Sequence, residues 1–204
     1  MVPRERVREP LLDDAQILAA VRCGNPSGAS ALYRRARPQV DRTIGRILGG
    51  RDADHDDLAQ LSMIEIVRSM QTFRGECSLD TWISRVTARL VFRELKRRRC
   101  DSHVFDRASS IEQANAPTDV AGDAAIRSTL GRIRRHLDAI EPMKAWAVVL
   151  HDVCGYDLRE VAEITETTVS AAQSRVVRGR TELHERIEAD PELADALENL
   201  RGRS

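Results

Sequence analysis

The stretch EVAEITETTVSAAQSRVVRGR, residues 160–180, decides the fold of the C-terminal part of this 204-residue chain. A short helix is predicted from Leu158 to about Ile164, where the apolar residues recur at helical spacing. A tight turn through Glu166 and Thr167 leads to a longer helix from about Thr168. Two helices joined by so short a turn have the layout of a helix-turn-helix.

The second helix of this pair has an apolar side and a polar side. Four residues keep inward spacing: Val169, Ala172, Val176 and Leu183. The more exposed side carries Ser170, Ala171, Gln173, Ser174, Arg175 and Arg178. Gln and Arg can read base edges in a major groove and Ser can hold a phosphate. An ordinary helical hairpin would share the apolar positions, so both interpretations stay open on this pattern alone.

The composition predicts an all-α protein. Hydrophobic residues make up 42% of the chain, aromatic residues 3% and charged residues 31%, which is typical of helices that bury aliphatic stripes. Upstream of the helix-turn-helix, Pro142 can begin a helix whose buried stripe ends near Gly155. That stripe is predicted to contain Trp146, Val149, Leu150 and Val153.

The chain divides into two small helical domains joined by a flexible linker. The linker is rich in Ser, Asn, Pro, Gly and Asp and lacks a sustained apolar period. The C-terminal tail could extend the last helix or form a regulatory segment. The predicted parts are an N-terminal tail (1–12), a helical domain (13–99), the linker (100–122), the helix-turn-helix domain (123–190) and a C-terminal tail (191–204).

Local charge, rather than total charge, indicates a nucleic-acid partner. The formal net charge is +0, so any such partner must be recognised by a local asymmetry. Between Arg85 and Arg99 only Glu94 is acidic, and the basic residues are Arg85, Arg89, Arg93, Lys96, Arg97, Arg98 and Arg99. A solvated face usually mixes both signs for pairing along the helix, so this one-sided run favours phosphate contact.

The segment FRGECSLDTW, residues 73–82, places two scarce aromatic residues at the ends of a polar loop that opens the basic helix. The loop could be a helix connection or a surface that holds a base. Phe73 and Trp82 could both be packing residues, since Trp82 shares an apolar helix face with Ile83, Val86 and Leu90.

Neither a metal, a cofactor nor a catalytic site is predicted. Asp52, Asp54, Asp56 and Asp57 precede an apolar stripe of Met63, Ile66, Val67 and Met70. These carboxylates favour a helix N-terminus over a divalent-metal site, because the Gly and bidentate Glu of a calcium loop are missing. His151 and Cys154 are only half of a possible metal site. No nucleophile and base are arranged for catalysis, so an enzyme is not expected.

The chain is expected to be cytoplasmic. The four cysteines Cys23, Cys77, Cys100 and Cys154 form no CxxC pair, as expected of reduced, structural thiols. The first residues, MVPRERVREP, do not resemble a signal peptide, and no apolar run is long enough for membrane insertion.

Five stretches together resemble a known family. They are DHDDLAQ, MIEIVRSM, TFRGECSLDTWISRV, LKRRR and EVAEITETTVSAAQSRVVRGR, in that order. In these motifs the chain resembles bacterial sigma factors of the extracytoplasmic-function (ECF) type, from the sigma-70 family, across roughly Asp13 to Leu183 except the linker. The first domain is then region 2-like and the second region 4-like.

The resemblance implies a promoter-specificity subunit without catalytic residues. It would bind RNA polymerase core at its clamp and flap regions, recognise minus-35 and minus-10 promoter elements, promote DNA melting for transcription initiation, and be controlled by an anti-sigma factor. Core binding maps to Asp57, Gln60, Glu65 and Arg68. Minus-10 binding maps to Phe73, Arg74, Gly75, Glu76, Cys77, Ser78, Trp82, Arg85, Arg89 and Lys96. Minus-35 binding maps to Ser170, Ala171, Gln173, Ser174, Arg175 and Arg178.

One departure from the family pattern has a structural consequence. Glu166 stands where the family usually has a Gly in the turn, so a turn that needs a positive φ would be strained. The rival function is a stand-alone regulator that binds duplex DNA without polymerase. That alternative leaves the loop at 73–82 and the basic helix unexplained.

Overall fold

The computed structural model describes residues 13–50, 53–105 and 121–201, and every regular element in these ranges is a helix. The predicted all-α class is therefore confirmed. Residues 106–120, the middle of the predicted linker, and the tail at 1–12 lie outside the described residues. Within the described part of the chain, no helix combines the length and apolar character that a bilayer crossing needs.

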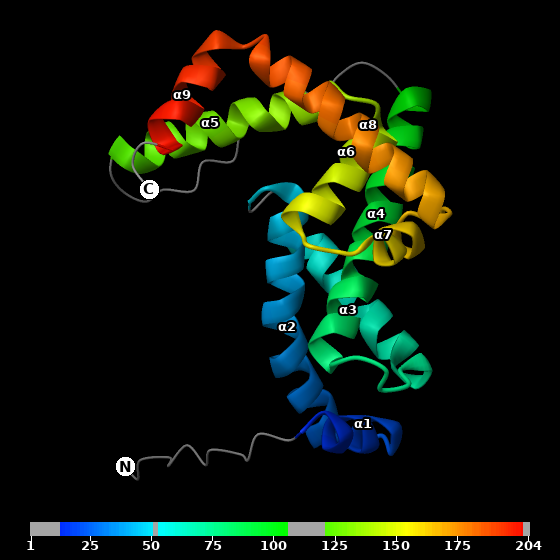
Figure 1. Ribbon diagram of the computed structural model, residues 1–204. Helices are drawn as coiled ribbons and strands as arrows, with labels where there is room; N and C mark the ends of the chain where they lie inside the picture. The colour runs from blue at the N-terminus through cyan, green and yellow to red at the C-terminus, as the bar shows by residue number, and fades with distance from the viewer. Residues whose placement is uncertain (1–12, 51–52, 106–120, 202–204) are drawn as a thin grey trace, which may run out of the picture.

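The N-terminal domain is built around one long helix. α2 (Pro26–Leu48) packs against α1 (Asp14–Arg22), α3 (His55–Ser69) and α4 (Leu79–Phe105), as Figure 1 shows. A short 3-10 helix, η1 (Met70–Thr72), follows α3. The shared core is aliphatic and contains Leu32, Val40, Ile44, Leu58, Ile66 and Ile83.

Local chemistry explains where α1 and α2 begin. Asp13 accepts a hydrogen bond from the Gln16 N–H (2.7 Å) and donates its own N–H to the Gln16 side chain (3.0 Å), which closes a capping box at the start of α1. α1 ends before Gly24, which has a φ of 69°. Asn25 then caps α2, and Pro26 occupies its first position.

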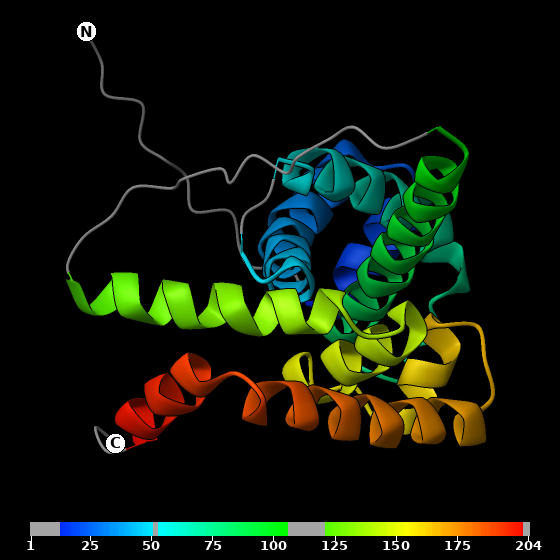
Figure 2. The same ribbon diagram turned by 90° about the horizontal axis from the view of Figure 1, so that it is seen from above.

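The second domain contains the remaining helices. α5 (Ala121–Asp138) runs beside α8 (Val169–Glu188), and Figure 2 shows the two from above. α6 (Pro142–Val148) continues into a π-helical turn at Val149–Val153 and is followed by α7 (Leu158–Ile164). α9 (Pro191–Arg201) is a separate helix that packs against α5 and α8.

Asp190 holds the junction between α8 and α9 against α5. It accepts hydrogen bonds from His136 (2.9 Å) and from Arg132 (2.6 Å). These bonds lower the pKa of Asp190 to about 2. The described part of the C-terminal tail therefore forms a separate helix and does not continue α8, and its regulatory role stays a prediction.

The predicted helix-turn-helix is present with the expected boundaries. Asp157 caps α7 through a capping box with Glu160, and Thr168 caps α8 by accepting the Ala171 N–H (3.2 Å). A Cβ built on Gly179 of α8 would lie 2.7 Å from the Val148 side chain and 3.0 Å from the Lys144 carbonyl. Glycine therefore permits the close approach of α8 to α6.

Three valines that the sequence pattern places on apolar helix faces are exposed instead. Val67 is exposed because the core-facing positions of α3 are Ala59, Ser62 and Ile66, and Val67 lies to one side of that stripe. Val169 is the first residue of α8, and the core contacts begin one turn later. Val153 ends the π-helical turn, where the extra residue shifts the register of the side chains.

The strain expected at Glu166 is present, since its φ is 53°. We predict that Glu166→Gly raises the free energy of unfolding by about 1 kcal/mol, because glycine adopts this conformation without a Cβ penalty. Urea unfolding would measure the change. In the control Glu185→Gly, an exposed position inside α8, the free energy should instead fall by about 1 kcal/mol. If the free energy of unfolding changed in the same direction in both variants, the prediction would be contradicted.

Candidate polymerase and nucleic-acid interfaces

The loop between η1 and α4 is a polar surface resting on two aromatic rings. Phe73 is 5% exposed and its ring centroid lies 5.3 Å from that of Trp82. Trp82 is itself half-buried. The residues between them with exposed side chains or backbone are Arg74, Gly75, Glu76 and Ser78, whereas Cys77 packs partly against the core. The aromatic residues support the loop, and the polar residues form its surface.

The basic helix α4 presents its arginines to carboxylates of other helices. Arg85 donates to Glu160 of α7 (2.7 Å), and Arg89 lies 3.7 Å from Glu163 one turn later. Burial lowers the pKa of Arg85, but the hydrogen bond to Glu160 and the attraction of the nearby negative charges together outweigh burial, so the pKa is raised above its ordinary value. Lys96 is exposed, with its Nζ 5.6 Å from the Phe92 ring centroid. The predicted phosphate-binding face is thus partly neutralised by α7.

Further contacts join the two domains at this place. The Tyr156 hydroxyl donates to the Ser84 carbonyl (3.1 Å). The Phe92 ring packs edge-on against Trp146, with the centroids 5.3 Å apart. Burial raises the pKa of Tyr156 to about 12, so its hydroxyl keeps its proton at neutral pH. Figure 1 shows α7 lying against α4.

α3 presents a mixed polar and apolar outer face. Asp57, Gln60 and Arg68 are exposed on it, as expected for partner-binding residues, whereas Glu65 is half-buried and 3.9 Å from Arg93 of α4. The sequence interpretation missed the exposed apolar residues between them, which are Leu61, Ile64 and Val67. Their spacing of three places them on one side of the helix, and this spacing was the signal that could have found them.

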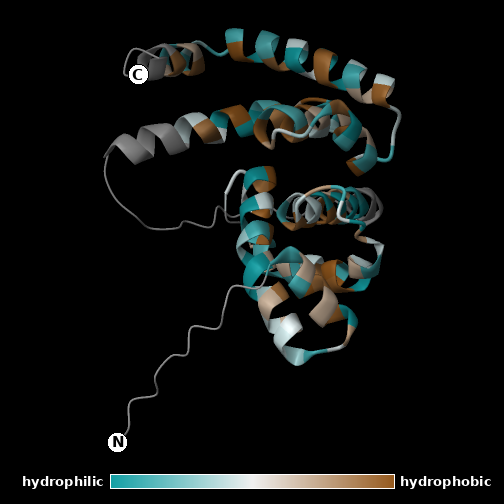
Figure 3. Cartoon of the chain, turned by 60° about the horizontal axis from the view of Figure 1, so that its bottom comes forward, coloured by the Kyte–Doolittle hydropathy of each residue, from teal (hydrophilic) through white to brown (hydrophobic). Residues whose placement is uncertain are grey.

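The α8 face holds the predicted minus-35 residues at different depths. Ser170, Gln173 and Arg178 are exposed, whereas Ala171, Ser174 and Arg175 are half-buried. Arg175 has a buried Nη1 without a hydrogen-bond partner among the described residues. Figure 3 shows polar and apolar positions alternating along α8. A shallow hollow of about 330 Å³ is lined by Ser170, Gln173, Ser174, Val177 and Arg178.

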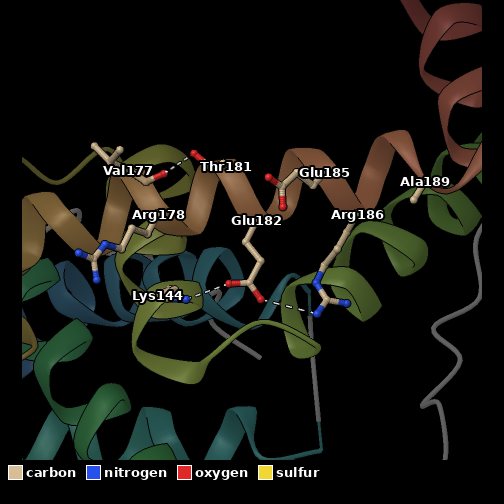
Figure 4. A pocket seen from close by; sticks show the side chains of 8 residues that line it. All are labelled: Lys144, Val177, Arg178, Thr181, Glu182, Glu185, Arg186 and Ala189. Atoms are coloured by element: carbon tan, nitrogen blue, oxygen red, sulfur yellow. Dashed lines mark hydrogen bonds and ion pairs between the residues drawn. The ribbon is translucent and has the colours of Figure 1, made fainter.

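A second, larger groove of about 630 Å³ lies beside this hollow, between α6 and the C-terminal half of α8 (Figure 4). Lys144 donates to Glu182 (3.0 Å), and Arg186 lies 3.6 Å from the same carboxylate. Val177 and Arg178 line both hollows. The groove therefore extends the α8 face with a surface of mixed charge.

No group of three His, Cys, Asp or Glu in the described ranges is placed to hold a metal ion. Asp54 makes no cap for α3 and pairs with Arg98 instead, while Asp56 bonds Arg37 (3.2 Å); Asp52 lies outside the described residues. His151 contacts Asp152 (2.9 Å). Burial raises the pKa of Cys154 to about 11, so this thiol stays protonated and unreactive at neutral pH.

Family models match both domains. The model described as Sigma-70 region 2 matches residues 32–100, and the one described as Sigma-70, region 4 matches residues 130–183. Each match falls on one of the two helical domains, in the order that the motifs predicted. The chain belongs to the sigma-70 family. It is an RNA polymerase sigma factor of the ECF type.

Full-length relatives support this assignment. The ECF RNA polymerase sigma factor SigM of Mycobacterium tuberculosis is 25% identical over 178 residues, which cover 83% of this chain and 82% of SigM. The ECF RNA polymerase sigma-E factor of Haemophilus influenzae is 26% identical over 189 residues, which cover 87% of this chain and 96% of that protein. The predicted family is confirmed.

Two solved structures have a similar fold. CnrH, solved in complex with the cytosolic domain of CnrY, has a TM-score of 0.54 and 21% identity, with coverage of 85% of this chain and 96% of CnrH. RpoE of Bartonella quintana, solved in complex with the anti-sigma factor NepR, has a TM-score of 0.51 and 17% identity. The match covers 78% of this chain and 95% of RpoE. At these identities the likeness concerns the fold alone.

Proposed function

We propose that this sigma factor binds RNA polymerase core through α3, reads an unpaired minus-10 base with the loop at 73–78, and reads the minus-35 duplex with α8. The observation that supports it best is the loop itself. Its polar residues are exposed, its aromatic residues are packed beneath, and a basic helix follows directly. Such a surface can hold a flipped base while cations hold the strand. The chain would act in the cytoplasm without catalysing a reaction itself.

The ion pairs of α4 set a condition on this function. Arg85 can give its full set of donors to the minus-10 strand only if it leaves Glu160, to which it is hydrogen-bonded, and Arg89 lies beside Glu163. A phosphate can replace a carboxylate as the partner of a guanidinium, because both accept the same planar pair of donors. We infer that α7 moves away from α4 when promoter DNA binds.

An anti-sigma factor is the proposed regulatory partner. The solved relative RpoE is bound to the anti-sigma factor NepR. In this chain the apolar residues Leu61, Ile64 and Val67 on the outer face of α3 would suit a protein partner, and core and the anti-sigma factor would then compete for that face.

Run-off transcription with purified core and a randomised promoter pool tests the proposal. Transcripts should begin downstream of two enriched sequence elements, a minus-10 element read by the loop and a minus-35 element read by α8. A chain that binds tightly to duplex DNA without polymerase, and starts no transcript with it, would instead be a stand-alone regulator.

We predict that Asp57→Lys weakens association with core at least ~10-fold before any DNA is present, because it reverses an exposed charge at the centre of the proposed contact. Binding of labelled core to the full chain measures this. Asp195→Lys is the matched control, since Asp195 is an exposed acid on α9. If both variants bind core as the wild type does, α3 is not the docking helix.

A further inference from the structure

The loop at 73–78 is held at both ends by α1, a helix that lies outside the matched region 2 segment. Phe73 is the first residue of the loop, and its carbonyl accepts a hydrogen bond from the Arg22 guanidinium (3.2 Å). At its far end, Asp14 accepts the Leu79 N–H (3.1 Å) at the start of α4. One short helix thus fixes both the point where the chain leaves η1 and the point where it enters α4.

Asp14 caps the N-terminus of α4 although it belongs to a different helix. The first N–H groups of a helix have no partner within the helix and are normally bound by the preceding residues. Ser78 binds the Thr81 N–H (3.2 Å) in that ordinary way. The Leu79 N–H is bound by a carboxylate 65 positions earlier in the chain.

α1 is itself fixed with little freedom to shift. Ile17 is 3% exposed and belongs to the core. A Cβ on Gly28 of α2 would lie 2.6 Å from the Ala20 Cβ and 2.8 Å from its backbone carbon, so α1 and α2 are in backbone contact. Arg35 of α2 lies 2.9 Å from Asp80 and 4.0 Å from Asp14, which ties α4 and α1 to the same helix.

We propose that Arg22 and Asp14 are positioning residues that set the base selectivity of the minus-10 loop without touching DNA. The proposal rests on the proposed function of the loop. Gly75 in the loop has a φ of 78°, and glycine restrains the backbone less than any other residue, so the contacts at the two ends are what fix the path of the loop. Release of either end lets the loop adopt several conformations, and a pocket that is not preorganised distinguishes bases poorly.

The test measures the affinity of holoenzyme for single-stranded minus-10 oligonucleotides that differ only in the unpaired base. Arg22→Ala and Asp14→Ala should each reduce the ratio of preferred to disfavoured affinity by ~3- to 10-fold, which is the size that one lost hydrogen bond supports. Asp14→Asn keeps an acceptor for the Leu79 N–H and should restore most of the selectivity. Core affinity and the thermal midpoint should stay near wild type.

Two control variants separate the possible outcomes. Arg42→Ala removes an exposed arginine from α2 and should change nothing. If Glu76→Ala alters selectivity but the α1 variants do not, the loop reads the base and the positioning role is wrong. If neither the α1 variants nor Glu76→Ala alters selectivity, the loop does not read the base, and the proposed function of the loop is wrong.

A second readout keeps the inference testable should an alanine variant lose stability. Hydrogen exchange of the amides from Gly75 to Leu79 should quicken in Arg22→Ala and Asp14→Ala, while the amides of α3 keep their protection. Uniform loss of protection across the N-terminal domain would mean that α1 stabilises the whole domain, and the specific role would be overturned.

Discussion

A chain carrying Arg85→Glu and Lys96→Glu is expected to bind core polymerase normally and to open promoter DNA on the order of 100-fold less well. Each reversed cation turns a phosphate attraction into repulsion, and each lost contact to a single strand lowers the slope of log affinity against log salt by about 0.7. The measurement is open-complex formation at several salt concentrations, with core affinity measured in parallel.

The ion pair between Arg85 and Glu160 supplies a sharp control for this prediction. Arg85→Glu also places two carboxylates together at the contact between the domains. The swapped pair Arg85→Glu with Glu160→Lys restores that attraction but not a cation toward DNA. If the swap rescues promoter opening, Arg85 acts through the domain contact and not through phosphate. A parallel fall in core affinity would show that the basic face has been misassigned.

Gly179→Val should destabilise the helix-turn-helix domain by about 3 kcal/mol, the upper end of the usual cost of overpacking. The new side chain would meet Val148 and the Lys144 backbone, and backbone cannot retreat as a flexible side chain can. α8 would have to move off α6, which also displaces the proposed DNA-reading residues. Urea unfolding followed by circular dichroism measures the stability, and binding to a minus-35 duplex measures the displacement.

Gly131→Val is the matched control for this variant. Gly131 is an exposed helical glycine in α5, and a Cβ there meets nothing within 4 Å. Valine is a slightly better helix former than glycine, so this change should be neutral or stabilising by a few tenths of a kcal/mol, roughly. If the two valine variants unfold at the same urea concentration, the close approach of α6 and α8 does not limit the choice of residue.

Features set by local chemistry could be predicted from the sequence. The bounds of α7 follow from the apolar spacing around Val161 and from the Asp157 cap, and the strain at Glu166 follows from the shape of the turn. The supporting role of Phe73 and Trp82 was one of two interpretations that the pattern left open. Their buried contact now favours it.

Features set by distant parts of the chain could not be predicted. Arg22 and Phe73 are 51 positions apart, and Arg85 and Glu160 are 75 apart. No periodic pattern links such residues, because their meeting depends on how whole helices pack. The π-helical turn that exposes Val153 is equally invisible to a count based on the ordinary helical period.

The edge-on contact between Phe92 and Trp146 has a consequence for anyone who works with one half of this molecule. Phe92 belongs to the N-terminal domain and is fully buried, and Trp146 belongs to the helix-turn-helix domain and is 9% exposed. A fragment cut within residues 106–120 would uncover one of these rings on each piece. Such fragments should be prone to self-association, and replacing the exposed ring in each fragment by a polar residue should make the fragment more soluble.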